Sequence, residues 1–269
     1  MNATDPTIDR FARFRRLHHA DRPLLLPNAW DHASAAALAD RGFAAIGTTS
    51  LGIAAAAGLP DASGAARGQT MSLARALTRL PALITVDIEG GFSEDPAEVA
   101  AMAAELARAG VVGVNIEDSR AGGRLVPASQ QCEVIAAVKE RVPRLFVNAR
   151  TDTYWLPDAP TDQTLPRAEA YRRAGADGLF VPGLTDEHTI AGLVRDLDAP
   201  LNVLYAPGRL TLSRLAELGV GRVSCGSLLF RAALWSAVRT ACAIADPDAV
   251  DPGLPSYGET QALSERFGD

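Results

Sequence analysis

The sequence predicts an α/β protein with the (β/α)8 TIM-type barrel fold, and three observations support this. The length of 269 residues fits one such barrel, which usually needs about 250 residues. Hydrophobic residues make up 48% of the chain, which is enough to bury a large core. Eight short apolar runs alternate with Ala- and Leu-rich segments of helical pattern. This count favours a closed parallel barrel over a doubly wound open sheet of about five or six strands.

The eight predicted strands share one feature, because each ends in polar or small residues. They lie at residues 24–27, 44–48, 82–87, 112–116, 144–149, 178–181, 201–204 and 222–225. The active sites of such barrels lie at the carboxyl ends of the strands. Polar residues at those ends are therefore the first candidates for a functional site.

Capping residues mark the helices between the strands. Asp31 precedes a helical segment that closes at Gly42, the order expected of an N-cap and a C-terminal glycine. Ser93 or Asp95 can cap the next clear helix, which ends at Gly110. Residues 1–20 predict a leading helix, and no linker interrupts residues 20–240.

The chain is predicted to divide into a barrel over residues 1–245 and a C-terminal linker and helix over residues 246–269. The linker is rich in Pro, Asp and Gly and precedes a short polar helix near residues 259–266. Such a tail either frays or packs on a neighbouring subunit.

Composition argues against several classes of partner. The net charge of −6, without a Lys/Arg cluster, makes nucleic acid and anionic membranes poor candidates. No apolar stretch approaches the length of a membrane span, and the N-terminus lacks the apolar region of a signal peptide, so we expect a cytoplasmic protein. Cys132, Cys225 and Cys242 lack metal-site or disulfide spacing, which indicates reduced, structural thiols.

Three carboxylates follow neighbouring predicted strands. Asp87 and Glu89 end the third strand, and Glu117 ends the fourth. Clustered carboxylates repel one another, and a hard divalent cation relieves that repulsion. Oxygen ligands with room for water suit Mg2+, with Mn2+ as a further possibility. The alternative is that one or two of the acids form salt bridges with Arg150 or cap loops.

The other polar residues at the strand ends suggest an anion site. Side chains two apart on a strand share a face, so Asn115 with Glu117, and Asn148 with Arg150, are expected to point into the barrel mouth. Arg150 is a natural clamp for a substrate carboxylate, although an ion pair with Asp152 or Glu117 would explain it equally. The segment of residues 47–52, GTTSLG, offers hydroxyls and backbone N–H groups in a tight turn.

The histidines do not add a catalytic base to this set. His18, His19, His32 and His188 are the four histidines of the chain, and we expect surface or capping roles for them. The residues form no recognisable nucleophile triad, and the glycine-rich stretches match no nucleotide-binding pattern.

Together the strand-end motifs resemble the isocitrate lyase / phosphoenolpyruvate mutase superfamily over residues 24–234. The motifs are PNAWD (27–31), GTTSLG (47–52), GLPD (58–61), VDIEGGF (86–92), GVNIEDS (113–119), NARTD (148–152) and GADGLFVPG (175–183). The resemblance implies a barrel in which acids matching Asp87, Glu89 and Glu117 hold Mg2+, partly through waters.

The resemblance also implies roles for residues around that metal. A substrate carboxylate would lie near Thr49, Ser50 and Leu51, and the conserved aspartate near the metal matches Asp61. Arg150 matches the substrate-binding arginine. Members of the superfamily are commonly tetramers that exchange a C-terminal helix, so we expect a dimer or tetramer here.

The chain departs from the resemblance at specific points. The lyases carry a K-K-C-G-H segment with a catalytic Cys, whereas residues 119–127 here read SRAGGRLVP. The mutases use a bulky residue where Gly47 stands and a His where Pro182 and Gly183 stand. Glu89 is one methylene longer than the usual Asp.

We therefore expect an Mg2+-dependent lyase that cleaves or forms a C–C bond next to the carbonyl of a small 2-oxo or 2-hydroxy carboxylic acid. One alternative is a 2-oxo acid-binding barrel with little turnover. Another is phosphoenolpyruvate mutase or phosphonopyruvate hydrolase chemistry on a P–C bond. A third is a phosphate-binding barrel that acts on phosphosugars, since the turn CGSLL (225–229) resembles a glycine-rich anion-binding loop.

Overall fold

The computed structural model describes residues 6–120, 122–245 and 254–267. Its main sheet has nine strands in the order β1-β11-β10-β9-β8-β5-β4-β3-β2, and every pair is parallel. The strands are β1 Leu24–Leu26, β2 Asn28–Ala29, β3 Ala45–Thr48, β4 Leu83–Asp87, β5 Gly113–Glu117, β8 Phe146–Arg150, β9 Gly178–Val181, β10 Leu201–Leu204 and β11 Arg222–Ser224. Each of the eight predicted segments overlaps a strand, and the first contains β1. β5 and β8 each end one residue later than predicted, at Glu117 and Arg150.

The barrel closes at Pro27. β1 pairs with β11 and β2 pairs with β3, so the two short strands are halves of one barrel strand on either side of a residue without an N–H donor. The Asn28 side chain joins the two edges at the carboxyl end. Its Nδ2 donates to Thr48 O over 2.7 Å, and its Oδ1 accepts from Cys225 N and Gly226 N, each over 2.9 Å.

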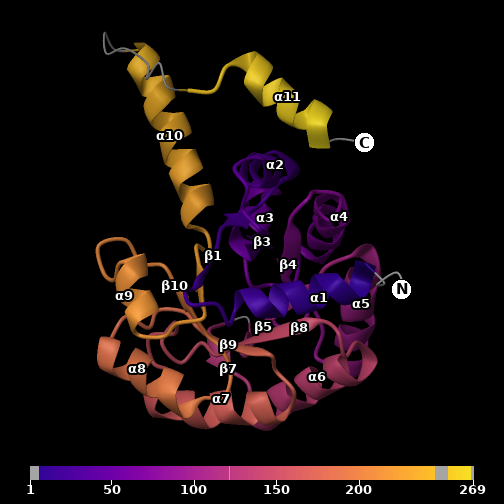
Figure 1. Cartoon of the computed structure of the whole chain (residues 1–269), viewed down its shortest axis with the longest axis vertical. Coiled ribbons are helices and arrows are strands. Elements are labelled where there is room, and N and C mark those ends of the chain that lie inside the picture. The colour runs from indigo at the N-terminus through magenta and orange to yellow at the C-terminus, as the bar shows by residue number, and fades with distance from the viewer. Residues whose placement is uncertain (1–5, 121, 246–253, 268–269) are drawn as a thin grey trace.

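Helices surround the barrel (Figure 1). They are α2 His32–Asp40, α3 Ser50–Ala56, α4 Arg67–Leu77, α5 Pro96–Ala109, α6 Ala128–Arg141, α7 Thr164–Arg173, α8 Glu187–Asp196 and α9 Leu212–Glu217, with a 3-10 turn at Thr161–Gln163. The expected caps are confirmed at Asp31, at Asp95 and at the left-handed Gly110. Helix α2 ends one residue earlier than expected, at cap Arg41, and Gly42 follows with φ 81°.

The segment predicted as a tight GTTSLG turn is instead a strand end followed directly by a helix. β3 ends at Thr48, and α3 begins at Ser50. A Cβ at Gly47 would lie 2.8 Å from Asn28 Nδ2. The amide that closes the barrel therefore takes the space in which the mutases place a bulky side chain.

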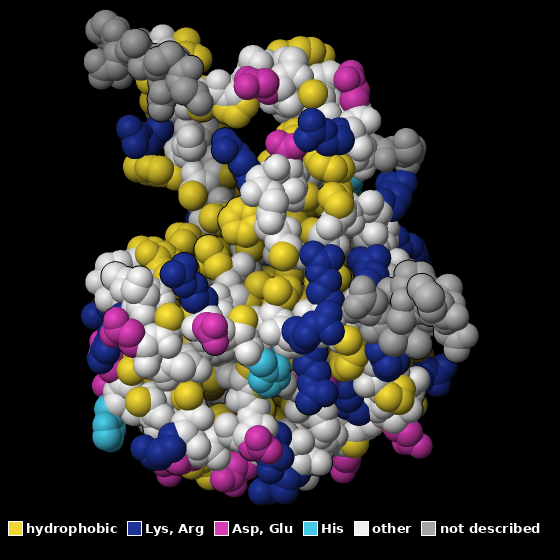
Figure 2. All heavy atoms as spheres, in the orientation of Figure 1, with side chains coloured by type: hydrophobic (Ala, Val, Ile, Leu, Met, Phe, Trp, Pro, Cys, Tyr) yellow, Lys and Arg dark blue, Asp and Glu magenta, His cyan; other side chains and the backbone are white. Residues whose placement is uncertain are grey.

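Helix α1 (Pro6–Leu17) covers the amino end of the barrel. Phe14, Leu26, Ala45, Leu83 and Phe146 form an apolar cluster there. Figure 2 also shows Lys and Arg side chains gathered over this helix, a basic cluster that we did not expect from the sequence.

His18 follows α1 and is buried, with 4% of its surface exposed. Its Nδ1 lies 2.9 Å from Phe14 O, so it caps the end of the helix. Its ring stacks on Phe146 at a centroid distance of 4.3 Å. The capping prediction is confirmed for His18, whereas a surface position is wrong, because the leading helix folds under the barrel and carries this ring into the core.

Above the apolar cluster the barrel interior is polar. Asn115, Asn148, Asn202 and Arg222 are all buried. Arg222 has 0% exposure, and its Nη2 reaches Asn115 Oδ1 over 3.3 Å. Branched apolar residues dominate the interiors of most such barrels, so this chain has placed an unusual polar layer directly beneath the candidate site.

Two helices follow the barrel, α10 (Leu228–Ala245) and α11 (Tyr257–Phe267). α10 extends away from the barrel in Figure 1, and hydrophobic side chains are visible along it in Figure 2. Leu234, Trp235 and Val238 are 53%, 65% and 60% exposed. α11 contacts α2 of the same chain, and the predicted linker at residues 246–253 lies outside the described residues.

Within the described part of the chain, no helix is both long and apolar enough to cross a membrane. The three cysteines are free thiols. A small antiparallel hairpin, β6 (Ser119–Arg120) with β7 (Arg124–Leu125), stands outside the barrel sheet and follows β5.

Candidate active site

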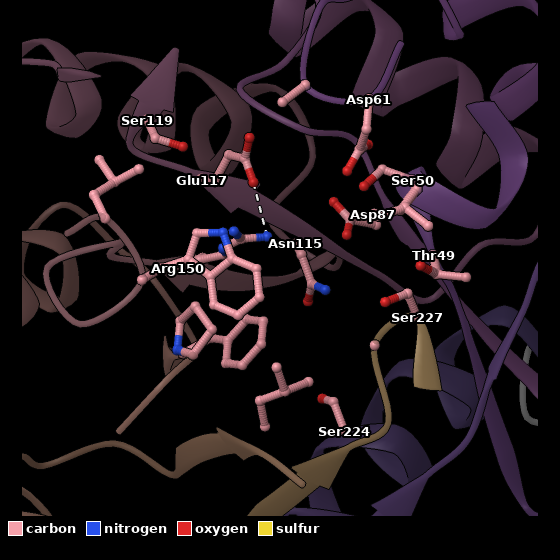
Figure 3. A pocket seen from close by; sticks show the side chains of 18 of the residues that line it. Thr49, Ser50, Asp61, Asp87, Asn115, Glu117, Ser119, Arg150, Ser224 and Ser227 are labelled. Carbon is pink, nitrogen blue, oxygen red and sulfur yellow. Dashed lines mark ion pairs between the residues drawn. The ribbon is translucent and has the colours of Figure 1, made fainter. Parts of the chain in front are cut away.

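A cavity of about 300 Å³ opens at the carboxyl ends of the barrel strands, where the strand-end argument predicted a site. Figure 3 shows Thr49, Ser50, Asp61 and Asp87 along one side of it, with Glu117 and Ser119 across from them. The polar lining is completed by Asn28, Ser63, Asn115, Arg120, Arg150, Ser224 and Ser227. Apolar side chains form part of the remaining wall, among them Leu51, Trp155, Leu156, Phe180, Pro182 and Leu204.

The predicted acids divide between the cavity and its wall. Asp87 and Glu117 line the cavity and are 9% and 5% exposed. Asp61 lies at the mouth and is exposed. Glu89 is not among the lining residues, because β4 ends at Asp87 and the backbone of Glu89 turns to a left-handed φ of 50°. The alternation of side chains along a strand therefore does not extend to Glu89.

Glu89 nevertheless keeps a carboxylate oxygen without a partner. Its Oε2 accepts from Gly64 N over 3.0 Å, whereas its buried Oε1 has no hydrogen-bond partner among the described residues. Burial, together with the charges of Asp61 and Asp87, raises the pKa of Glu89. A buried carboxylate oxygen in this position requires a donor or a cation.

The same electrostatic conflict affects the two lining acids. Burial raises the pKa of Glu117 to about 8, although the charge of Arg150 acts in the opposite direction. Burial also raises the pKa of Asp87 against the influence of Arg150. Repulsion from the charge of Asp61 raises the pKa of both Asp87 and Glu117 further. The site thus concentrates more negative charge than its cations compensate.

These donors fit a hard divalent cation. Among the described residues, no three His, Cys, Asp or Glu side chains are grouped so that they alone could hold a metal ion. Mg2+ commonly binds through one or two carboxylates and keeps several waters. Asp87 and Glu117, with the unpartnered oxygen of Glu89 nearby, therefore suit a largely hydrated Mg2+ ion.

Arg150 is already occupied by carboxylates. Its Nη1 lies 2.8 Å from Glu117 Oε2 (Figure 3). Its Nε donates to Asp152 Oδ1 over 2.6 Å. Burial opposes its charge, but these partners outweigh burial and raise the pKa of Arg150. The alternative interpretation of Arg150, an ion pair with Asp152 or Glu117, is confirmed with both partners at once.

Asn115 points an amide into the cavity in a defined orientation. Its Oδ1 accepts from Asn148 Nδ2 over 2.9 Å and from Arg222 Nη2 over 3.3 Å. With the oxygen held from below, the Nδ2 group remains as the donor on the cavity side. Asn148, predicted to contact substrate, is not among the lining residues and instead supports Asn115.

The end of β3, in the GTTSLG segment, also supports the site. Thr48 Oγ1 accepts from Asp87 N over 2.9 Å, which links β3 to the lining acid. Thr49 and Ser50 are buried and line the cavity with Leu51. The structure therefore brings all three predicted carboxylate-binding residues to the cavity wall.

Asp118 shows how strand alternation separates neighbouring acids. It follows Glu117 but faces the helix layer, where its Oδ2 accepts from Thr151 Oγ1, Tyr171 OH and Arg167 Nη1 over 2.8, 2.8 and 3.1 Å. Asp118 is completely buried. It is a structural centre that joins β5, the loop after β8 and α7.

Sequence reasoning missed several cavity residues. Arg120, Trp155 and Phe180 all line it. Phe180 could have been found, because it lies two residues after Gly178 on the inward face of β9. Arg120 and Trp155 lie outside the barrel strands, on the hairpin and on the loop after β8, where no periodic pattern predicts their direction.

This chain is similar to known proteins over most of its length. The phosphoenolpyruvate phosphomutase family profile matches residues 14–245. An uncharacterized protein of Mycobacterium tuberculosis is 46% identical over 250 residues, which are 93% of this chain and 95% of that protein. The 2-methylisocitrate lyase of Bacillus subtilis is 32% identical over 198 residues, 70% of this chain and 65% of the lyase.

Solved structures share the barrel. One is the structure of a proposed phosphonomutase from Burkholderia cenocepacia J2315, with a TM-score of 0.83 and 38% sequence identity. The match covers 87% of this chain and 99% of that one. A 2,3-dimethylmalate lyase structure has a TM-score of 0.81 over 96% of this chain and 94% of its own, at 24% identity, which is evidence for the fold alone. The chain is thus an enzyme of the phosphoenolpyruvate phosphomutase family, within the isocitrate lyase / phosphoenolpyruvate mutase superfamily of lyases and mutases.

Proposed function

We propose that this enzyme is an Mg2+-dependent lyase that breaks or forms a C–C bond next to the carbonyl of a small 2-oxo or 2-hydroxy carboxylic acid. The observation that carries this proposal is the arrangement of Asp61, Asp87 and Glu117 around one cavity with Arg150 between the acids and the apolar wall. A cation bound by Asp87 and Glu117 would supply Lewis-acid stabilisation of negative charge on the substrate oxygen.

The chain's own residues would orient the substrate. Thr49, Ser50 and Leu51 line the end of the cavity at the start of α3, where hydroxyl and backbone N–H groups can hold a carboxylate. The Nδ2 of Asn115 can donate to the substrate oxygen on which negative charge develops. Donors of this kind stabilise the transition state most when they are held in place beforehand.

Arg150 would act through its partners rather than as an open clamp. Its two ion pairs hold Glu117 and Asp152 in place. Its positive charge also lies beside the substrate region, between the rings of Trp155 and Phe180, each 5.8 Å from the guanidinium carbon. We therefore assign it to positioning Glu117 and to balancing negative charge.

A second candidate is a barrel that binds 2-oxo acids with little turnover. The hairpin that stands where the lyases carry their acid–base segment contains no Cys, His or Lys. Retention of the anion and metal side chains without that segment favours this alternative. Chemistry at a P–C bond is less well supported, since Gly47 and Pro182 replace the side chains that the mutases use.

An NMR time course separates these functions. Oxaloacetate, 2-methylisocitrate, isocitrate, phosphonopyruvate and 2-oxoglutarate would be followed with Mg2+, with EDTA, with Glu117→Gln and with the exposed control Glu140→Gln. The lyase proposal expects loss of one compound with Mg2+, abolished by EDTA and by Glu117→Gln but unaffected by Glu140→Gln. Line broadening without consumption would favour the binding barrel. If no compound showed either consumption or line broadening, the proposed ligand class would be rejected.

A further inference from the structure

The barrel interior contains a fully buried arginine, Arg222 on β11, that forms no ion pair with any described carboxylate. Arg150 and Arg167, by contrast, each pair with at least one carboxylate. Burial lowers the pKa of Arg222 to about 9 against the influence of the Asp87 charge, so the group stays charged at neutral pH. A buried cation without a counter-ion opposes folding, and a role in the site would explain why it is present.

Arg222 holds two residues of the cavity floor from below. Its Nη2 donates to Asn115 Oδ1 over 3.3 Å, and its Nε donates to Ser224 Oγ over 3.2 Å. Asn115 and Ser224 both line the cavity (Figure 3). The Ser224 hydroxyl donates in turn to Asn202 Oδ1 over 2.9 Å. These contacts fix the orientation of both polar groups, and Asn115 is left with its Nδ2 donor on the cavity side.

The charge of Arg222 lies between this polar floor and an apolar underside. The apolar cluster that includes Phe14 and Phe146 closes the amino end of the barrel, and the charge of Arg222 also acts on the buried His18. Charges interact more strongly in a dry interior of low dielectric constant than in water. The guanidinium, separated from the cavity by the Asn115 side chain, therefore makes the electrostatic potential in the cavity more positive.

We propose that Arg222 is a positioning residue, which directs the Asn115 amide at the substrate and, from beneath the cavity, stabilises negative charge that develops on a substrate oxygen. This inference rests on the proposed function and adds to it a residue that touches neither the substrate nor a metal ion. The chain would accept the unfavourable burial of this charge in exchange for its effect on the reacting state, a trade-off common at functional sites. The alternative is a structural residue that only fills the barrel interior.

Two small ligands of similar size test the inference. Pyruvate has one negative charge and a neutral carbonyl group, whereas oxalate is doubly negative and resembles a 2-oxo acid whose carbonyl oxygen has gained negative charge. Dissociation constants for both, with Mg2+, and thermal melting would be measured for the wild type, Arg222→Met, Arg222→Lys and Arg167→Met. Arg167 is a matched control, because it is also a buried arginine but pairs with Asp118 and does not line the cavity.

The wild type should bind oxalate more tightly than pyruvate. Arg222→Met should weaken oxalate on the order of tenfold and pyruvate by about twofold at most, less than the loss of a donor that touches the charge, because Arg222 acts through Asn115. Arg222→Lys keeps the charge and should retain part of the preference. Arg222→Met should melt no lower than the wild type, because it removes a buried cation that has no counter-ion. Arg167→Met leaves a buried carboxylate without its cation, so it should melt lower and keep the ligand preference.

Other results would overturn the inference. Equal weakening of both ligands by Arg222→Met, or a melting temperature as low as that of Arg167→Met, would make Arg222 a structural residue, and so would failure of Arg222→Met to fold. An unchanged preference for oxalate in a folded Arg222→Met would show that the charge of Arg222 does not act in the cavity. In these cases the proposed function would stand. If the wild type bound neither oxalate nor pyruvate, the proposed function and this inference would be rejected together.

Discussion

His18 makes the stability of this enzyme depend on pH. Burial lowers the pKa of His18 from 6.5 to about 3, and the charges of Arg222 and, more weakly, of His19 act in the same direction, whereas the bond to Phe14 O opposes the shift without reversing it. The buried Nε2 has no partner among the described residues. A proton on this ring would therefore be far less favourable in the folded chain than in the unfolded one.

The sign of the effect follows from proton uptake. Between pH 6.5 and about 3, His18 is protonated in the unfolded state but neutral in the folded state. The free energy of unfolding therefore decreases as the pH falls through this window. Above pH 6.5 both states are neutral and the effect vanishes. At pH 5 the unfolded pKa lies 1.5 units higher, which corresponds to a loss of about 2 kcal/mol.

Reversible urea unfolding at pH 8 and pH 5 measures this loss. His18→Phe keeps a ring against Phe146 but cannot be protonated, so the wild type should lose about 2 kcal/mol more than the variant between the two pH values. His18→Met serves the same purpose if a phenyl ring overpacks the site. The exposed control His188→Gln should follow the wild type. Parallel curves for the wild type and both His18 variants would refute the reasoning.

Two further predictions concern the core and the assembly. Asp118→Asn leaves Arg167 as a buried cation without its carboxylate and should lower the free energy of unfolding by about 3–5 kcal/mol. The exposed control Asp158→Asn should lower it by almost nothing. Equal urea midpoints for the two variants would contradict this prediction. We propose that the exposed apolar face of α10 is covered by another copy of the chain in a dimer or tetramer, so Trp235→Glu should lower the mass found by light scattering, whereas Ser236→Glu should leave it unchanged. A monomeric wild type would reject the assembly.

The sequence alone predicted the barrel because its strongest signals are local. Eight short apolar runs followed by capped helices require only near neighbours to be recognised, and Asp31, Asp95 and Gly110 cap their helices as their residue types suggest. The rule that strands deliver polar side chains to one end of a barrel then placed Asp87 and Glu117 at the cavity.

Alternation along a strand predicted side-chain direction only while the strand lasted. It placed Asn115 and Glu117 on the inner face. The structure shows the same alternation at Asp118, for which no position was predicted and which lies on the opposite face. The alternation did not extend to Glu89, since β4 ends two residues earlier. It also could not tell how deep an inward residue lies, so Asn148 supports the site from below instead of lining it.

Pairing between distant segments was decided by the tertiary structure. Arg150 binds Glu117 and Asp152 rather than standing open. Arg222 reaches Asn115 across 107 positions of sequence, and His18 is buried because a leading helix folds under the barrel. The sequence determined which residues are available at the strand ends, since strand and helix periodicity are local. Only the closed barrel decided which charges meet, because charge compensation depends on groups far apart in the chain.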